Sequence, residues 1–250
     1  MHTPPIAGHG CVALDDVWLT YGDHPVLKGI SLAVSGGEIL CVLGGSGEGK
    51  STILRLILRL IRPDSGRIYV DGTEICQAPT DVVLKLRRHM GMVFQGSALF
   101  DSLTVFDNVA FPLYEHSTLD DEQIRARVNE VLSFVDLVPV QVLDLLPAEL
   151  SGGMQKRVGI ARAIVHEPSI LLFDEPTSGL DPVTTKTIDQ LILKLQRELG
   201  ACAVVVTHDI QSAERISTRI ALLEKGEIRF IGTPEEMLAS KDPHVCAFLS

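Results

Sequence analysis

The sequence predicts an α/β fold with an antiparallel β layer near its start and an all-helical insertion in its middle. Three observations carry this prediction. A glycine-rich loop, residues 44–52, stands between an apolar strand-like run and a helix-like run. From Pro168 onward, short apolar runs alternate with helical patterns, which is typical of a parallel sheet covered by helices. Between Ser97 and Glu167 the pattern is largely helical instead.

The first part of the chain predicts strands on both sides of the glycine-rich loop. Two antiparallel-looking strands precede the strand that leads into the loop, and we interpret them as the added β layer. Asp71-Gly72 is a hairpin turn signal, and Arg55, Arg59 and Arg62 are expected to form a solvated stripe on one face of the helix after the loop. The elements expected here are strands at Val12–Tyr21, Val26–Val34, Ile39–Leu43, Arg67–Val70 and Met90–Phe94, and helices at Ser51–Ile61 and Val82–His89.

The second part of the chain predicts the helical insertion and then a return to α/β alternation. Asp181 is expected to cap a helix that begins at Pro182, and Thr233 to Glu236 form a capping box that opens the last helix. The other elements expected here are helices at Val105–Glu115, Asp120–Val135, Ser151–His166 and Asp209–Ile216, and strands at Ser169–Phe173, Ala203–Val206, Arg219–Leu223 and Glu227–Ile231.

Composition limits the classes of function. The chain has 250 residues, is 46% hydrophobic and carries a formal charge of -10, so it can bury a sizeable core and lacks the overall basic footprint of a nucleic-acid-binding protein. Its five cysteines are scattered without a C-x-x-C pair, which favours a reducing compartment over a disulfide framework. Met1–Gly10 lacks a signal-peptide pattern, and no run is long enough to span a bilayer. We therefore expect a protein that is soluble by itself.

The glycine-rich loop is the strongest functional signal. It reads G-G-S-G-E-G-K-S-T, and its first eight residues fit G-x-x-x-x-G-K-[ST], the phosphate-binding loop. Glycines bring backbone N–H groups close to an anion, Lys50 can reach the outer phosphates, and Ser51 can offer its hydroxyl to Mg²⁺. A glycine-rich turn with a surface lysine is the alternative, but the position between a buried strand and a helix favours a phosphate site. The candidate nucleotide-binding residues are Gly44, Gly45, Ser46, Gly47, Glu48, Gly49, Lys50, Ser51 and Thr52.

Polar residues at strand ends add candidates for catalysis and metal binding. Asp174 and Glu175 follow a buried strand, so Asp174 is well placed for Mg²⁺ and Glu175 can polarise an attacking water. His208 follows another strand and can bond a phosphate oxygen, and Gln95 ends a third and can reach the metal or the water. Taken alone, the histidine would be a structural residue and the glutamine a loop residue.

Two further features each allow a functional and a purely structural interpretation when only their own residues are considered. Ser151, Gly152 and Gly153 at a helix start would expose N–H groups to an anion, although an ordinary serine cap with a glycine turn has the same pattern. Tyr21 is either a buried aromatic at a turn, which is the default interpretation, or a residue that stacks on an adenine ring.

Together these features resemble the ATPase subunit of ABC transporters. The family's motifs occur in order over roughly Val12–Leu249: Tyr21, the phosphate loop, Gln95, the signature Leu150–Gln155, the strand motif Ile170–Glu175, Ser178-Gly179-Leu180-Asp181 and His208. The resemblance implies a P-loop NTPase fold with a RecA-like core. It also implies a single ABC ATPase domain over residues 12–250, with the core and β layer at about 12–95 and 168–250 and the helical subdomain at about 96–167.

The same resemblance assigns roles to the candidate residues. Two nucleotide-binding domains would enclose two ATP molecules head to tail, and the single copy of each motif implies a homodimer or a paired subunit. Tyr21 would stack on adenine. Ser51 and Gln95 would coordinate Mg²⁺, and Asp174 would lie behind these ligands or close to them. The implied catalytic residues are Lys50, Glu175 as general base, and His208, which positions the γ-phosphate. The residues implied to meet ATP on the other subunit are Ser151, Gly152, Gly153, Gln155 and Asp181.

A narrower resemblance involves the segment from Gln95 to Leu113. Its Q-G-S-A-L-F-D and V-F-D-N-V-A-F-P-L stretches look like those of the ATPases of Mla-type phospholipid transporters, relatives of the Mce systems. The implied partners are a membrane permease, an Mce-domain protein and, in some members, a small STAS-domain subunit. The implied location is the cytoplasmic face of the inner membrane, held there by the permease. Leu99-Phe100 and Val105–Leu113 are either core of the insertion, a permease contact, or both on different faces.

Departures and alternatives complete the expectations. Gly45 stands where the family often has proline, and Glu48 where a small or neutral residue is commoner; we expect the Glu48 side chain to point outward, with activity retained. One alternative function is the same ATPase chemistry for another cargo, such as an amino acid or a toluene-like solvent. The other is a non-transport ABC ATPase in translation or DNA repair, against which the single compact core and the charge of -10 argue.

Overall fold

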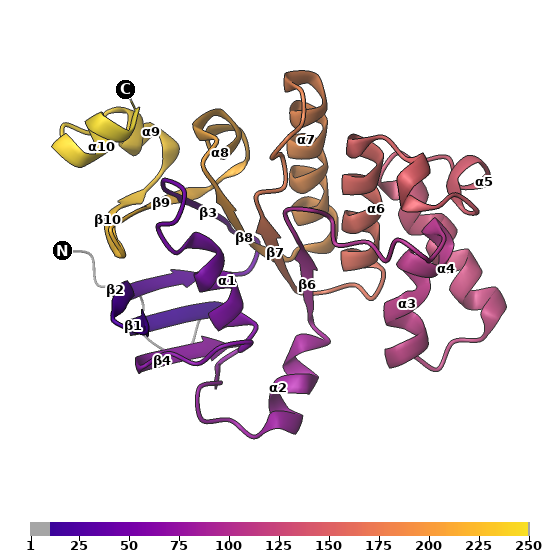
Figure 1. Ribbon diagram of the computed structural model, residues 1–250, viewed down its shortest axis with the longest axis horizontal. Coiled ribbons are helices and arrows are strands. Elements are labelled where there is room, and N and C mark those ends of the chain that lie inside the picture. Colours follow the sequence, from indigo (N-terminus) through magenta and orange to yellow (C-terminus); the bar gives the residue numbers. More distant parts are fainter. Residues whose placement is uncertain (1–10, 250) are drawn as a thin grey trace.

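The computed structural model describes residues 11–249, which form two β-sheets and the helices that cover them (Figure 1). One sheet has four strands in the order β2-β1-β4-β5, and the other has six in the order β10-β9-β3-β8-β7-β6. The larger sheet is parallel from β9 to β6, and β10 pairs antiparallel with β9. The antiparallel β1–β2 pair confirms the expected β layer. The expectation about a signal peptide concerns residues 1–10, which lie outside the described residues.

The strands begin and end close to their predicted limits. The small sheet consists of β1 (Val12–Tyr21), β2 (His24–Val34), β4 (Ser65–Val70) and β5 (Thr73–Glu74). The large sheet consists of β3 (Ile39–Leu43), β6 (Met90–Val93), β7 (Ile170–Asp174), β8 (Cys202–Thr207), β9 (Arg219–Glu224) and β10 (Glu227–Gly232). The predicted Asp71-Gly72 turn joins β4 to β5, and both residues have positive φ, 46° and 73°.

The large sheet is buried on both faces, and this is why its strands are continuous apolar runs. In β3, Leu40 and Val42 pack into the cluster that the small sheet and α1 (Lys50–Ile57) cover. The alternate residues Ile39, Cys41 and Leu43 pack into a second cluster on the opposite face. A strand that feeds two cores has no polar face, so its sequence shows no period of two.

Helices cover both faces of the large sheet (Figure 1). Asp181 caps α7 as predicted, accepting from the N–H groups of Val183 and Thr184, and Thr233 and Glu236 form the predicted capping box of α9. The helices after α1 are α2 (Thr80–Arg87), α3 (Val105–His116), α4 (Asp121–Phe134), α5 (Pro139–Val142), the 3₁₀ turn Pro147–Glu149, α6 (Gly152–Ile164), α7 (Pro182–Leu199), α8 (Ile210–Ile216), α9 (Pro234–Leu238) and α10 (Pro243–Leu249).

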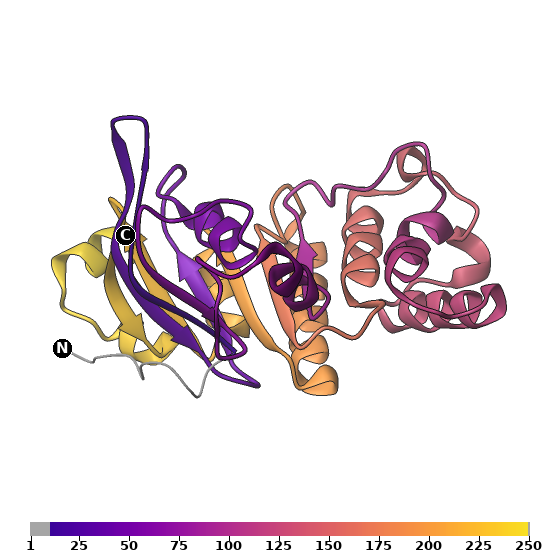
Figure 2. The same cartoon turned by 90° about the horizontal axis from the view of Figure 1, so that it is seen from below.

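Helices α3 to α6 form a lobe at one end of the molecule (Figure 1, Figure 2). The lobe has no separate core, because its buried side chains belong to the same cluster as those of α7 and α8. Helix α6 joins the lobe to β6 at close range: a Cβ on Gly91 would lie 2.3 Å from the carbonyl oxygen of Ala163. A glycine is therefore required where strand and helix meet.

The prediction for the helix after the phosphate loop was wrong at its end. Helix α1 stops at Ile57, not Ile61, because Arg59 adopts a left-handed φ of 49°. Arg87 closes this end by donating to the carbonyl oxygens of Leu58 (2.8 Å) and Arg59 (3.0 Å). Since Arg59 and Arg62 lie beyond the helix, the expected arginine stripe does not form.

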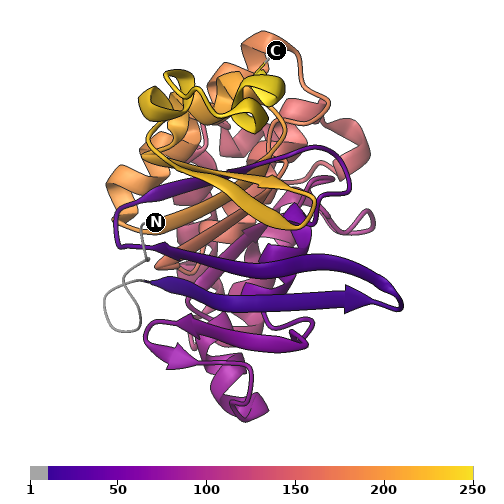
Figure 3. The ribbon, with the colours of Figure 1, turned by 90° about the vertical axis from the view of Figure 1, so that its left-hand side faces the viewer.

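Other short elements escaped prediction. They are β5, α5, the 3₁₀ turn and α10, so the helix opened by Thr233 is not the last one. The two sheets meet where β10 lies beside β2 (Figure 3), and Lys28 N donates to Gly226 O at 2.8 Å across this junction. Within residues 11–249, no helix combines the length and apolar character needed to cross a bilayer.

Candidate functional site

The phosphate loop is shaped by two glycines in the left-handed region. Gly47 has φ of 83° and Gly49 of 97°, and Gly49 precedes α1 without a side-chain cap. The first N–H groups of a helix have no partner within it, so this uncapped end leaves donors directed at the loop. A Cβ on Gly49 would also lie 3.0 Å from side-chain atoms of Val26 and Leu27. The loop thus offers backbone donors to an anion, as the sequence predicts.

Lys50 is held over the loop by the loop itself. Its Nζ donates to the carbonyl oxygens of Gly44 (2.9 Å) and Gly45 (2.8 Å), and the residue is 7% exposed. Glu175 Oε1 lies 3.6 Å from the same ammonium. A positive charge is therefore fixed at the place where the outer phosphates of a nucleotide would lie.

Oxygen-bearing side chains meet beside the loop. Ser51 Oγ donates to Asp174 Oδ1 at 2.7 Å, and Gln95 Nε2 lies 3.5 Å from Ser178 Oγ. Hydroxyl, carboxylate and amide oxygens are the donors that Mg²⁺ prefers, and this ion usually takes only one or two protein ligands besides phosphate oxygens and water. In the described residues no cluster of three or more His, Cys, Asp or Glu forms a metal cage. The donors present suit an Mg²⁺ that arrives with a nucleotide.

Glu175 lies between two nitrogen groups. Its Oε2 is 2.9 Å from His208 Nδ1, its Oε1 faces Lys50, and the residue is 8% exposed. Glu175 has a left-handed φ of 47°, and its N–H donates to Val206 O at 2.9 Å. A non-glycine residue in that region is strained, and such strain persists where the surroundings fix the residue. The strand end thus directs this carboxylate to the loop.

The loop and the strand ends line one cavity of about 610 Å³. Tyr21 is 44% exposed at its edge, so the default interpretation of a buried aromatic was wrong. Of the predicted residues, Gly44, Glu48 and Asp174 do not line it, and Asp174 is joined to the cavity through Ser51. The lining residues are Tyr21, Val26, Gly45, Ser46, Gly47, Gly49, Lys50, Ser51, Thr52, Gln95, Glu175 and His208.

The signature residues line a different cavity, of about 360 Å³. It contains Ser151, Gly152, Gly153 and Asp181 together, and it shares no lining residue with the phosphate cavity. Gln155, which was expected to join this set, does not line it; its Nε2 donates to the carbonyl oxygen of Pro147 at 2.9 Å. One chain thus carries two separate cavities, each lined by a different set of the predicted residues.

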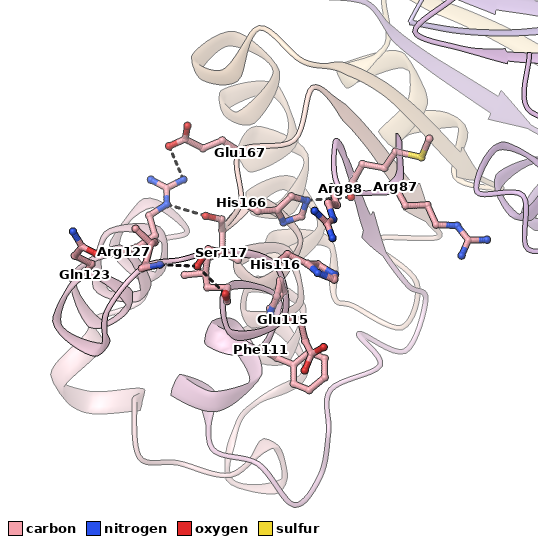
Figure 4. Close-up of a pocket in the computed structure, with 15 residues that line it drawn as sticks. Arg87, Arg88, Phe111, Glu115, His116, Ser117, Gln123, Arg127, His166 and Glu167 are labelled. Carbon is pink, nitrogen blue, oxygen red and sulfur yellow. Dashed lines mark hydrogen bonds and ion pairs between the residues drawn. The ribbon is translucent and has the colours of Figure 1, made fainter. Parts of the chain in front are cut away.

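A groove separates the core from the helical lobe. A cavity of about 680 Å³ lies between α2 and β6 on one side and α3, α4 and the turn after α6 on the other (Figure 4). A smaller cavity of about 290 Å³ adjoins it and shares Phe111, Pro112 and His166. Phe100 and Phe111 are 43% and 41% exposed here, with ring centroids 5.0 Å apart. Such a partly apolar, open groove is typical of a surface that binds another protein.

Sequence reasoning missed two residues that shape the site. Lys156 of α6 is buried and its Nζ donates to the carbonyl oxygen of Gln95; burial lowers its pKa, an effect that Asp174 and Glu175 oppose. Lys225 donates its backbone N–H to the Glu48 carboxylate. The Lys225 contact could not be predicted from the sequence, because every residue except proline has a backbone N–H group.

Comparison with known proteins identifies related chains. The family described as "ABC transporter" matches residues 27–178. The "Probable ribonucleotide transport ATP-binding protein mkl" of Mycobacterium tuberculosis is 38% identical over 231 residues, 92% of this chain and 64% of that protein. The "Methionine import ATP-binding protein MetN" of Carboxydothermus hydrogenoformans is 44% identical over 220 residues, 87% of this chain and 64% of that protein. The chain therefore spans about 64% of the length of these relatives.

Solved structures share the fold closely. The dimeric ATP-binding cassette MJ0796, in a post-hydrolysis state bound to ADP and Pi, has a TM-score of 0.82 and 38% identity, over 89% of this chain and 98% of that chain. The cbiO1 protein of Clostridium perfringens, part of the ABC transporter complex cbiONQ, has a TM-score of 0.84 and 33% identity, over 94% of this chain and 93% of that chain.

Fold and site first define a class: this is a P-loop ATPase domain, which binds ATP with Mg²⁺ and hydrolyses it. More narrowly, the chain belongs to the ABC transporter family and is one of its ATP-binding cassettes.

Proposed function

We propose that this chain is the ATP-hydrolysing subunit of an ABC transporter and that it works as a dimer. The observation that carries this proposal is the separation of the phosphate cavity from the signature cavity within one chain. Neither cavity alone contains both the phosphate loop and the signature. Two chains placed head to tail would bring the phosphate loop of each against the signature of the other and so complete two sites. The dimeric arrangement of the related cassette MJ0796 supports the same conclusion.

The proposed roles follow the geometry. Lys50 and the loop amides bind the phosphates, Tyr21 stacks on the base, and Ser51 and Gln95 hold Mg²⁺ with Asp174 behind Ser51. Bound Mg²⁺ would neutralise charge that develops on the phosphate oxygens. From the other subunit, Ser151, Gly152, Gly153 and Asp181 meet the nucleotide. Gln155 donates to Pro147 O in the turn before α6, so it holds the backbone that precedes these residues and does not contact ATP itself.

Glu175 is the proposed general base. A base must reach the proton of the attacking water, and this carboxylate lines the phosphate cavity beside Lys50. His208, 2.9 Å away, fixes one carboxylate oxygen and leaves its ring at the cavity wall, where it would position the γ-phosphate.

The test is Glu175→Gln in the full chain. The amide keeps the size of the side chain but cannot accept the proton, so turnover should fall about 100-fold or more while ATP still binds. Trapped ATP should then hold two chains together in gel filtration, with Ser151→Ala in the same background as the control that weakens this dimer. Normal hydrolysis by Glu175→Gln would refute the assigned base, and a strictly monomeric ATP-bound form would refute the shared site.

The proposed membrane partner is a permease that docks in the groove between core and lobe. The groove carries Phe100 and Phe111 at its surface, and it begins at the loop that contains Gln95. A partner seated there would sense the state of the phosphate site. The resulting location is the cytoplasmic face of the cell membrane, reached through the permease.

For the cargo we propose a phospholipid, moved through the permease and an Mce-domain protein, with a small STAS-domain subunit as an optional fourth component. The support is the Gln95 to Leu113 segment and its resemblance to Mla-type ATPases. A second candidate is an amino acid, since a relative named for methionine import is 44% identical. Purification of the native membrane complex, with mass spectrometry of its subunits and bound lipid, distinguishes the two. A co-purifying amino-acid-binding protein and no lipid would overturn the phospholipid proposal.

A further inference from the structure

The loop that carries Gln95 is fastened to the helix that carries the signature. Lys156 Nζ donates to Gln95 O, and Arg162 donates to Ser97 O and Ala98 O, both at 2.8 Å. Between these two cations Gly159 lets the loop approach: a Cβ there would lie 3.3 Å from Ser97 Cβ. Three residues at a spacing of three on α6 thus contact the loop: Lys156 and Arg162 bond its carbonyl oxygens, and Gly159 leaves room for Ser97 between them.

The loop conformation depends on these contacts. Ser97 and Ala98 both have left-handed φ, 61° and 47°, a conformation that non-glycine residues adopt at a cost. Ser97 is 3% exposed, so its carbonyl oxygen requires a partner, which Arg162 supplies. Without the two cations, the carbonyl oxygen of the buried Ser97 would lose its donor, those of the exposed Gln95 and Ala98 would lose theirs, and the strained backbone would be free to relax.

The burial of Lys156 is difficult to explain by stability alone. The residue is 6% exposed, and removing an ammonium group from water is unfavourable unless it is paired. The hydrogen bond to the carbonyl oxygen of Gln95 offsets only a small part of that desolvation free energy. Asp174 and Glu175 lie close enough to favour its charged form. Lys156 is thus a buried cation near Asp174 and Glu175 that is also bonded to the backbone of Gln95, the proposed metal ligand, so it can link that residue to α6.

We propose that Lys156, supported by Arg162, is a positioning residue that fixes Gln95 relative to the signature. Lys156 lies four residues after Gly152, about 6 Å along the helix axis. The loop and the N-terminal end of α6 therefore move as one unit, and a shift of Gln95 toward Mg²⁺ shifts Ser151 and Gly152 with it. The inference rests on the proposed role of Gln95 as a metal ligand.

The experiment measures ATP hydrolysis by the full chain against Mg²⁺ concentration. Lys156→Met keeps the length of the side chain and removes its donors, so the Mg²⁺ concentration for half-maximal rate should rise about tenfold, as for residues that orient a metal ligand. Binding of a fluorescent ATP analogue in EDTA should stay unchanged, which shows that the variant is folded. Lys156→Arg, which restores a cationic donor, should recover most of the shift.

Lys194→Met is the matched control. Lys194 also donates to a carbonyl oxygen between core and lobe, that of Phe134 at 2.8 Å, but far along the chain from Gln95. Its loss should leave the Mg²⁺ midpoint unchanged. An equal shift in Lys194→Met, or no shift in Lys156→Met, would overturn the inference.

Gln95→Ala separates this inference from the function on which it rests. It should raise the Mg²⁺ midpoint by itself, and adding Lys156→Met should then raise it little further, because no side chain is left to position. If Gln95→Ala has no effect, the metal role of Gln95 fails and the inference with it. If Gln95→Ala shifts the midpoint and the Lys156→Met effect simply adds, only the inference fails.

Discussion

The Glu48 carboxylate accepts a hydrogen bond from the backbone N–H of Lys225, and this ties the phosphate loop to the turn between β9 and β10. The same turn is held from the other side, since Gly226 O accepts from Lys28 N. Glu48 does not line the phosphate cavity, so its side chain points outward as the sequence analysis expects. An acid that is unusual at this place in the family acts here as an anchor for the loop.

The anchor predicts different effects for two substitutions of Glu48. Glu48→Ala removes the acceptor and should lower the free energy of unfolding by about 1–2 kcal/mol, since a hydrogen bond to a charged group is lost. Glu48→Gln keeps an acceptor oxygen and should retain most of that stability. Its ATPase activity should stay within about twofold of the parent, because a partly exposed charge outside the cavity has little effect on bound phosphates. Urea denaturation and steady-state hydrolysis measure both. Equal destabilisation by Ala and Gln would show that the charge, and not the anchor, matters.

The contact between β6 and α6 predicts a large effect of a small change. Gly91→Ala places a methyl group 2.3 Å from Ala163 O, so strand and helix must separate, at a cost of about 3 kcal/mol. Gly36→Ala is the matched control, because Gly36 is exposed, its φ lies outside the left-handed region and its nearest neighbour is Cys11 Sγ at 3.9 Å. That variant should lie within about 0.5 kcal/mol of the parent in the same denaturation experiment. Similar stabilities for the two variants would contradict the close contact.

The cysteines predict a pattern of thiol reactivity. Cys246 is exposed, whereas Cys41, Cys76 and Cys202 are buried. Burial raises the pKa of Cys76 to about 11, and it raises the pKa values of Cys41 and Cys202 further. Because the thiolate is the reactive form, about one Cys76 thiol in a thousand is reactive at pH 8.

Iodoacetamide at pH 8, followed by mass spectrometry, should therefore label Cys246 in the native protein and the three buried cysteines only in denaturant. A Cys246→Ser variant should lose the fast native reaction. Rapid native labelling of Cys41 or Cys202 would mean that the core opens more readily than its packing indicates.

The sequence predicts what depends on local pattern. The motif G-x-x-x-x-G-K-[ST] fixes its own backbone, so the loop could be predicted, and the cap at Asp181 follows from one residue and the proline after it. The resemblance to one family then supplied the order of distant motifs. The phosphate loop and the end of a buried strand already placed Ser51 and Asp174 at one Mg²⁺ site, and the hydrogen bond between them agrees with this prediction.

What could not be predicted depends on contacts between distant residues. Arg87 donates to the carbonyl oxygens of Leu58 and Arg59 where helix α1 ends. Arg87 lies far along the chain, so residues 58–61 alone do not predict that the helix ends there. The exposure of Tyr21 and the inward turn of Gln155 likewise depend on where other segments pack. The burial of Lys156 opposes the general preference of lysine for water, so a sequence pattern predicts the opposite.

The last prediction concerns the groove and its phenylalanines. The sequence offered Phe100 and Phe106 equally as permease contacts, and the structure separates them. Phe100 is 43% exposed in the groove, whereas Phe106 packs partly on the core cluster under Arg125, whose guanidinium lies 4.8 Å from its ring. Phe100→Ala should therefore leave the unfolding free energy within about 0.5 kcal/mol of the parent, while Phe106→Ala should lower it by about 2 kcal/mol.

In assembly with the permease the order should be reversed, with Phe100→Ala the more damaging variant. When each is co-expressed with the permease, Phe100→Ala should weaken pull-down of the complex and uncouple ATPase activity from transport, because an apolar anchor at an interface is lost. Phe106→Ala, once folded, should assemble normally. If Phe100→Ala assembles and couples like the parent, the groove is not the docking surface, and the exposed pair of rings at Phe100 and Phe111 would then need another partner to explain it.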